Sequence, residues 1–324
     1  MKHLDLQVIQ QGLKWLDAGA PVWLCTVMAT FGSAPREPGS MLAVVAGGES
    51  CGSLSGGCVE EDFLERLARG EFSSGNQIIR YGEGGLAPTL ALPCGGVLDV
   101  LVEPFASDSR SLEHFKALEK ALLGQRSVRR NVQLGGLSRE LSDAVSTGPK
   151  VTVNEKEAVI AVGPVKRLVI AGLSPVAEYC AQFALALGFE VIICDPRPEH
   201  MARAAEVLPG VRLYEALPAV FIAEGGCHAA TAVVALTHDP RIDDLTLMEA
   251  VRTDAFYIGA MGSVRTSTKR MERLARIAQL DMAARQRIHA PIGLRLGSKT
   301  PAEIALSVMA DVLRVGNGIE IGAL

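Results

Sequence analysis

Residues 168–195, LVIAGLSPVAEYCAQFALALGFEVIICD, decide the fold of the second half of this chain. Two short and wholly apolar runs, at 168–171 and 191–194, flank a segment whose apolar residues recur with helical spacing. Apolar runs of this length on either side of a helix are typical of parallel strands that are buried on both faces. The stretch therefore predicts a β-α-β unit of a Rossmann-like sheet.

The turn of this unit has part of a dinucleotide-binding motif. Gly172 takes the first glycine position and Ala177 can replace the third, but Ser174 stands where glycine lets the backbone approach a pyrophosphate. Asp195 follows Gly172 by 23 residues, near the spacing of about 20 for a ribose-binding carboxylate. One hypothesis is therefore an NAD(P)-dependent oxidoreductase, and the other is a Rossmann-type scaffold that binds no dinucleotide.

Two further strand ends in this half carry polar residues. His238 follows the strand predicted at 232–236, and Gly262-Ser263 follow the strand predicted at 256–258. Ligands of open α/β sheets bind at the carboxyl ends of the strands, so we expect these residues to face a ligand. The alternative is that the acid after His238 merely caps the next helix.

The pattern changes near Gly163-Pro164, and the first half of the chain mixes predicted helices and strands. The expected elements there are a helix at Leu4–Asp17, strands at 23–30, 41–46 and 97–102, and a helix at 111–123. We therefore expect an α/β protein with an α+β domain over residues 1–108, a connecting segment with strands over 109–163, and a Rossmann-like parallel-sheet domain over 164–324.

Three loops of the first half combine glycine with groups that bind anions or metals. The loop 32–39 holds Ser33 and Arg36, and the planar guanidinium suits a phosphate or a carboxylate. In the loop 52–60, GSLSGGCVE, the glycines free backbone N–H groups to form an anion-binding concavity at a helix start. The loop 93–96, PCGG, holds another thiol in a glycine-rich bend. Together the loops predict a pocket with a phosphate anchor and soft sulfur ligands.

The chain has seven cysteines, and an odd number without a secretory signal indicates a reduced, cytosolic protein. Three fall in predicted regular elements and are expected in the core: Cys25, Cys180 and Cys194. Cys58 and Cys94 lie in glycine-rich loops, where a thiol can act as a nucleophile or a soft ligand, although a structural role is the alternative for each. Cys51 and Cys227 fit either interpretation.

The composition excludes several classes of protein. Apolar residues make up 48% of the chain and charged residues 21%, which is enough for a sizeable core and argues against disorder. The net charge is −4 and no block of lysine and arginine stands out, so we expect no nucleic acid partner. No apolar stretch is long enough to span a bilayer, and the first ten residues do not form a signal peptide. We expect a cytoplasmic protein without a membrane partner.

The loops and strand ends together resemble the XdhC/CoxI family of accessory proteins for molybdenum hydroxylases such as xanthine dehydrogenase. Besides the three loops, the shared motifs are the crossover ending at DPR 195–197, THDPR 237–241, YIGAMGS 257–263, IHAPIG 288–293 and TPAEI 300–304. The likeness extends over nearly the whole chain. The sequence departs from the family pattern at Ser174, where glycine is usual, and at Val264, where a basic residue often follows Gly-Ser.

The resemblance implies a protein that binds the molybdenum cofactor, of the molybdopterin type, and supports or protects its sulfurated form. It implies insertion of that cofactor into a xanthine dehydrogenase-type apoenzyme, and so a cofactor chaperone rather than a catalyst, in the form of a homodimer. A thiol-dependent transferase is a further hypothesis, in which Cys58 carries sulfur as a persulfide and a cysteine desulfurase is a partner.

Combining the motifs with the resemblance gives a set of expected cofactor-binding residues. They are Ser33, Arg36, Ser55, Gly56, Gly57, Cys58, Glu60, Cys94, Gly95, Gly96, Gly172, Ser174, Asp195, His238, Gly262 and Ser263. Of these, Cys58 and Cys94 are the expected ligands for molybdenum, because thiolates suit soft metal centres.

Overall fold

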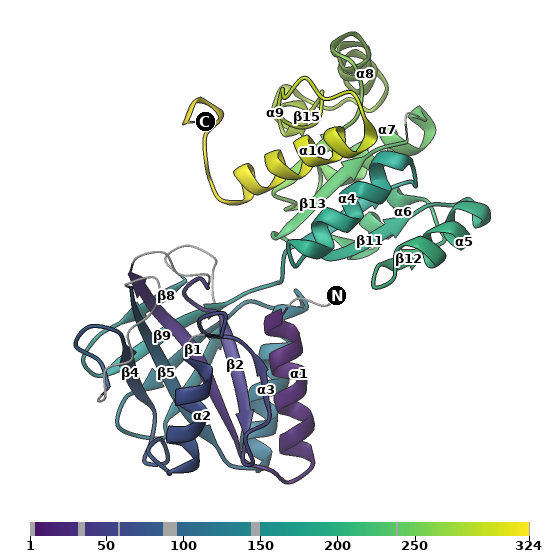
Figure 1. Cartoon of the computed structure of the whole chain (residues 1–324). Coiled ribbons are helices and arrows are strands. Elements are labelled where there is room, and N and C mark those ends of the chain that lie inside the picture. The colour runs from purple at the N-terminus through teal and green to yellow at the C-terminus, as the bar shows by residue number, and fades with distance from the viewer. Residues whose placement is uncertain are drawn as a thin grey trace. The chain divides into compact units, whose positions relative to one another are not determined.

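The computed structural model describes residues 4–31, 36–57, 59–86, 96–143, 150–237 and 239–323. The chain divides into two compact units, Leu4–Pro164 and Val165–Leu324 (Figure 1). Each unit has its own sheet and its own apolar core. Among the described residues, no helix is both long and apolar enough to cross a bilayer.

The second unit is built on a parallel sheet with the strand order β12-β11-β10-β13-β14-β15. Its strands are β10 (Arg167–Ala171), β11 (Glu190–Cys194), β12 (Arg212–Tyr214), β13 (Thr231–Ala235), β14 (Tyr257–Ala260) and β15 (Ile288–His289). Counted along the chain, this order is that of a Rossmann fold, in which the direction of strand addition reverses between β10 and β13. The predicted Rossmann-like sheet is confirmed.

Helices cover both faces of this sheet. They are α4 (Pro175–Ala186), α5 (Pro198–Val207), α6 (Pro218–Phe221), α7 (Pro240–Ala250), α8 (Val264–Ile277), α9 (Met282–Gln286) and α10 (Pro301–Gly316), with a π-helical segment at Ile222–Gly226 and a 3-10 turn at Ile321–Ala323. Alternate side chains of β10 enter two cores: Leu168 and Ile170 pack with α4 and α10, while Val169 and Ala171 pack with α7 and α8. Figure 1 shows α4 and α10 together on one face. The β10–α4–β11 crossover is thus the centre of the unit.

The first unit has two antiparallel sheets and three helices among its described residues. The five-stranded sheet has the order β3-β2-β1-β5-β4 and the four-stranded sheet the order β7-β6-β9-β8. The elements are α1 (Leu4–Asp17), β1 (Val22–Phe31), β2 (Met41–Val45), β3 (Ser50–Gly52), α2 (Glu60–Ala68), β4 (Gln77–Tyr81), β5 (Val97–Phe105), α3 (Ser109–Leu122), β6 (Val128–Gln133), β7 (Arg139–Asp143), β8 (Val151–Val153) and β9 (Glu157–Val162). This arrangement confirms the expected α+β class.

Helices α1 and α2 place the functional loops of this unit. Phe63 of α2 packs into the core that includes Cys25 and Val27 of the central strand β1. Helix α1 packs against β2, β3 and α3. Its approach to α3 depends on Gly12, because a Cβ there would lie 2.4 Å from the Phe115 ring. The loop that joins β3 to α2 is therefore held at both ends by packed elements.

Candidate functional site

The turn between β3 and α2 folds around the carboxylate of Glu60. Its Oε1 accepts hydrogen bonds from the backbone N–H groups of Leu54 (2.8 Å) and Ser55 (3.0 Å) and from Ser53 Oγ (2.7 Å). Its Oε2 accepts from Ser55 Oγ (2.7 Å) and from the backbone N–H of Gly57 (3.1 Å). Hydrogen-bond donors therefore surround both oxygens of this carboxylate.

The backbone N–H groups of this turn were predicted to bind an external anion, but in the structure they bind Glu60. Gly56 and Gly57 have φ angles of 82° and 115°, which only glycine adopts readily, and the turn wraps around the carboxylate as a result. Burial acts to raise the pKa of Glu60, but hydrogen bonds from Ser55 and Ser53 outweigh burial and lower the pKa to about 2. The carboxylate is thus charged at neutral pH and fills the anion-binding concavity.

Arg36 lies against the same turn. Its Nε donates to the Ser53 carbonyl at 3.2 Å, and an Nη atom lies 3.9 Å from Asp5 Oδ1 in α1. Asp5 in turn accepts the backbone N–H of Met41 at 3.1 Å, which ties α1 to β2. The Arg36 side chain is 23% exposed, so its guanidinium is positioned by the turn and still reaches solvent. The structure therefore brings Arg36 together with the turn that holds Ser55 and Glu60.

Five of the predicted site residues lie outside the residues that the structure describes: Ser33, Cys58, Cys94, Gly95 and His238. Gly96 is described, and it precedes β5. The carbonyl oxygen of Gly96 would lie 2.4 Å from a Cβ on Gly82. Glycine at position 82 therefore lets the chain at Gly82 lie close to the chain at Gly96. The expected proximity of Cys58 and Cys94 to Arg36 stays a prediction.

The other five cysteines are free thiols; three are buried, and Cys51 and Cys227 are partly buried. Cys25, Cys180 and Cys194 are fully buried, which confirms their expected place in the core. Burial raises the pKa of Cys180 and of Cys194 to about 12, and that of Cys227 to about 11. Within the described ranges, no group of three or more His, Cys, Asp or Glu residues is arranged to hold a metal ion. The predicted metal ligands, Cys58 and Cys94, lie outside those ranges.

In the second unit, Asp195 at the end of β11 holds the turn that follows β10. Its Oδ2 accepts the Leu173 backbone N–H at 2.7 Å, and the Arg197 guanidinium binds both carboxylate oxygens at 2.8 and 2.6 Å. Burial acts to raise the pKa of Asp195, but these hydrogen bonds lower it below its ordinary value. The carboxylate is fully buried, so in this conformation it orders its own chain.

Gly172 packs directly against the loop that follows β13. Its φ is 79°, and a Cβ on it would lie only 1.9 Å from Cγ2 of Thr237. Thr237 is fixed in turn, because its Oγ1 donates to Asp243 Oδ1 at 2.6 Å. The two loops therefore meet where the strand order reverses, which is where ligands of this sheet type bind.

Two predicted site serines begin helices. Ser174 caps α4 by accepting the Ala177 backbone N–H at 3.2 Å, and Ser263 caps α8 by accepting the Thr266 backbone N–H at 3.1 Å. Ser174, which stands in place of the usual glycine of the motif, therefore has a structural role, since it accepts a hydrogen bond from an N–H of the helix. Gly262 directly precedes the cap of α8.

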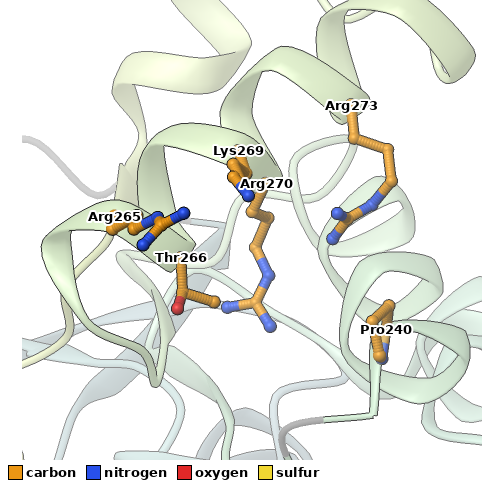
Figure 2. A pocket seen from close by; sticks show the side chains of 6 residues that line it. All are labelled: Pro240, Arg265, Thr266, Lys269, Arg270 and Arg273. Carbon is orange, nitrogen blue, oxygen red and sulfur yellow. The ribbon is translucent and has the colours of Figure 1, made fainter.

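A basic pocket lies at the start of α8 (Figure 2). Its volume is about 390 Å³, and its lining residues are Pro240, Arg265, Thr266, Lys269, Arg270 and Arg273. The predicted site residues stop at Ser263 and do not include these four cations. The spacing of these cations in the sequence could have revealed them, because helical residues three or four apart lie on one face of the helix.

Arg270 is the buried member of the basic pocket, with 2% of its side chain exposed. Its Nε lies 3.1 Å from Asp244 Oδ1, and an Nη atom lies 2.9 Å from Asp243 Oδ2. A further Nη donates to the Met261 carbonyl at 3.0 Å. Arg270 therefore ties α8 to α7 and to the loop after β14, and so gives the pocket a fixed wall.

Comparison with known proteins places both units in one family. The model described as the XdhC and CoxI family matches residues 15–82, and the model described as the XdhC Rossmann domain matches residues 168–312. A crystal structure described as a xanthine dehydrogenase from Bacillus halodurans has the same fold, with a TM-score of 0.71, 23% identity, and coverage of 100% of this chain and 98% of that chain.

Two curated relatives match almost the entire chain. One, from Escherichia coli (strain K12), is named molybdenum cofactor insertion chaperone PaoD; it is 28% identical over 312 residues, which cover 95% of this chain and 87% of that protein. The other, from Bacillus subtilis (strain 168), is named as a probable xanthine dehydrogenase subunit; it is 24% identical over 322 residues, with 92% and 94% covered. These matches, together with the two family models, confirm the resemblance: the chain belongs to the XdhC and CoxI family.

Proposed function

We propose that this chain binds a molybdenum cofactor as cargo, supports its sulfurated form and inserts it into an apo-hydroxylase of the xanthine dehydrogenase type. The observation that carries the proposal is the match, over 95% of this chain, to a protein named molybdenum cofactor insertion chaperone. The relative named as a probable xanthine dehydrogenase subunit supports the class of recipient. In this role the protein binds and releases a cofactor.

The chemistry of the first unit fits such a cargo in one respect and limits it in another. The cargo combines sulfur ligands around molybdenum with a phosphate-bearing tail, and the partly exposed Arg36 guanidinium suits a phosphate. The Glu60 carboxylate already takes the N–H groups of the neighbouring turn. A phosphate near this turn would therefore interact with Arg36 and not with the turn's backbone. Cys58, which follows Gly57 in the sequence, supplies a thiol for the sulfur-rich centre.

The experiment is a transfer assay with purified full-length chain. The chain is incubated with isolated molybdenum cofactor, separated from unbound cofactor and mixed with an apo-hydroxylase, whose activity is then followed. We expect the chain to retain cofactor and to activate the apo-hydroxylase. A chain that neither retains the cofactor nor increases activation would contradict the proposal.

Two cysteine variants refine this assay. Cys58→Ala is expected to lower the amount of activated hydroxylase, because a soft ligand or sulfur carrier is removed. Cys51→Ala is the matched control, since Cys51 lies in the preceding strand β3 and is partly buried. Equal loss in both variants would indicate a general effect on folding and would argue against a specific role for Cys58.

A further inference from the structure

The basic pocket carries more positive charge than its neighbours neutralise. Arg270 and Arg273 are each paired with aspartates of α7. No carboxylate of the described residues lies within ion-pair distance of Arg265 or Lys269, although both line the same pocket. Two cationic side chains are therefore available to a ligand.

This arrangement of charge costs α8 stability. The first turn of α8 contains Arg265 and no acidic residue, although the helix dipole disfavours a cation at that end. Arg265 and Lys269 are four residues apart, as are Lys269 and Arg273, and like charges at this spacing destabilise a helix. Sequences depart from the favourable placement of charges along a helix mainly at functional sites. An anion bound among these side chains would relieve the repulsion.

The position and size of the pocket also suit an anionic ligand. Pro240 is the first residue of α7 and Thr266 lies in the first turn of α8, so two helix starts contribute to one pocket. The aligned peptide dipoles give a helix start a partial positive charge, although Pro240 has no N–H and the Thr266 N–H already donates to Ser263 Oγ. These helices follow β13 and β14, so the pocket lies at the carboxyl edge of the sheet, where ligands of such sheets bind. Its volume of about 390 Å³ is within the range of small-molecule sites.

We propose that the basic pocket binds the phosphate or diphosphate group of a ligand. A phosphate offers several acceptor oxygens and a charge near −2, which matches the ammonium of Lys269 and the planar guanidinium of Arg265. Figure 2 shows the cations of α8 around the pocket, with Pro240 of α7 across from them. The group comes either from the phosphate-bearing tail of the cofactor cargo or from a free nucleotide, and only the first source rests on the proposed function.

Calorimetric titration of the full chain with pyrophosphate, at physiological salt, tests the site itself. We expect saturable binding to the parent chain, and at least about tenfold weaker binding to the double variant Arg265→Gln/Lys269→Gln, because charge-assisted hydrogen bonds are lost. The thermal midpoint of the double variant is expected to equal or exceed that of the parent, since the like-charge pairs are gone. Weaker binding with an unchanged midpoint cannot be ascribed to unfolding.

Arg276→Gln is the matched control, because Arg276 lies on the same helix, is exposed and does not line the pocket. It removes one positive charge from α8 and is expected to change the pyrophosphate affinity by less than about twofold, as for a screened surface charge. Absence of binding to the parent chain would overturn the proposal. Equal affinity of the parent and the double variant would overturn it as well, as would an equal loss in Arg276→Gln.

A second titration distinguishes the two sources of phosphate. If the cargo's tail occupies the pocket, chain loaded with molybdenum cofactor no longer binds pyrophosphate, and the double variant retains less cofactor. If a free nucleotide is the ligand, loaded chain still binds pyrophosphate and a nucleoside triphosphate competes with it. Both results support a phosphate site. Failure of the proposed function would give a different result. The parent chain would bind pyrophosphate but would not activate the apo-hydroxylase.

Discussion

A single carboxylate sets the shape of the turn between β3 and α2. Glu60 accepts hydrogen bonds from serine hydroxyls and from backbone N–H groups of the turn. An unpaired N–H that is withdrawn from water costs free energy, so the turn depends on the charge of Glu60. The same carboxylate keeps other anions away from the turn.

We expect Glu60→Gln to lower the free energy of unfolding by about 1–3 kcal/mol at pH 7, because an amide NH₂ would face N–H donors. The pKa of Glu60 is about 2 in the folded chain, against an ordinary value of 4.5. Its stabilising effect is thus complete above pH 4.5 and is lost as the pH falls from 4.5 towards 2. The difference between parent and variant, measured by urea unfolding, should shrink as the pH is lowered through that range.

Glu61→Gln provides the control for this measurement. Glu61 is exposed in the same first turn of α2, so its replacement removes an equal charge without disturbing the turn. We expect a change of only a few tenths of a kcal/mol, from the helix dipole alone. If the two variants lost similar stability, the hydrogen bonds to Glu60 would not be the cause.

The sequence identified the residues of this turn but not their partners. Ser55, Gly57 and Glu60 were expected to face a cofactor, because glycine before a helix is typical of anion sites. The turn can bind either an anion from outside the protein or the carboxylate of Glu60, depending on where the Glu60 side chain lies. The position of Glu60 at the start of a helix does not determine where its side chain lies. Arg265 and Lys269 were missed for a related reason, since a basic helix face is usually only solvated.

At the scale of elements, proline is the first residue of five of the seven α-helices described in the second unit. The sequence predicts helices over 201–208 and 243–251, but α5 begins at Pro198 and α7 at Pro240. The first turn of a helix needs no apolar residue, so periodicity detects the start late, whereas proline is favoured at the first position. Strand β4, Gln77–Tyr81, was missed because it is short and its flanks are polar.

The turn between β10 and α4 gives an element-scale prediction. Gly172→Ala should lower the free energy of unfolding by about 2–4 kcal/mol, because the φ of 79° strains alanine and its Cβ would overlap Cγ2 of Thr237. Thr237→Ser removes that methyl group and keeps the hydroxyl that donates to Asp243.

A double-mutant cycle by urea unfolding measures this contact. In the Thr237→Ser background, Gly172→Ala should cost only about 1–2 kcal/mol, which is the backbone strain alone. Strictly additive effects would show that the loop after β13 moves freely away from Gly172, and that the two loops do not depend on each other.

At the scale of the whole molecule, the chain consists of two units with separate cores. We expect residues 4–164 and 165–324, expressed separately, each to unfold in one cooperative transition in urea, because each core is made within its own unit. The fragment 165–324 should also bind pyrophosphate as the full chain does, since every residue of the basic pocket lies in it. A fragment without a cooperative transition would show that its core needs the other unit.

The fold was far easier to predict than the site. Apolar strands that alternate with helices predict a parallel sheet. The reason is that β-α-β crossovers are almost always right-handed and that strands buried on both faces are almost wholly apolar. The site depends on contacts between residues distant in sequence, such as Arg36 with Ser53 and Thr237 with Gly172. Such contacts leave no local pattern, and only the motif residues themselves could be named in advance.

Of the five described thiols, three are fully buried and two are partly buried, so alkylation of cysteine can follow the unfolding of the chain. The pKa is raised in all five described cysteines: Cys25, Cys51, Cys180, Cys194 and Cys227. The thiolate is the form that attacks an alkylating reagent and displaces iodide, so a short pulse of iodoacetamide at pH 7 should leave these five unlabelled in the folded chain, and early label should lie on Cys58 or Cys94. In increasing urea, label on Cys25 and Cys51 would mark the opening of the first unit. Label on Cys180, Cys194 and Cys227 would mark the opening of the second, so one mass spectrum would follow both units at once.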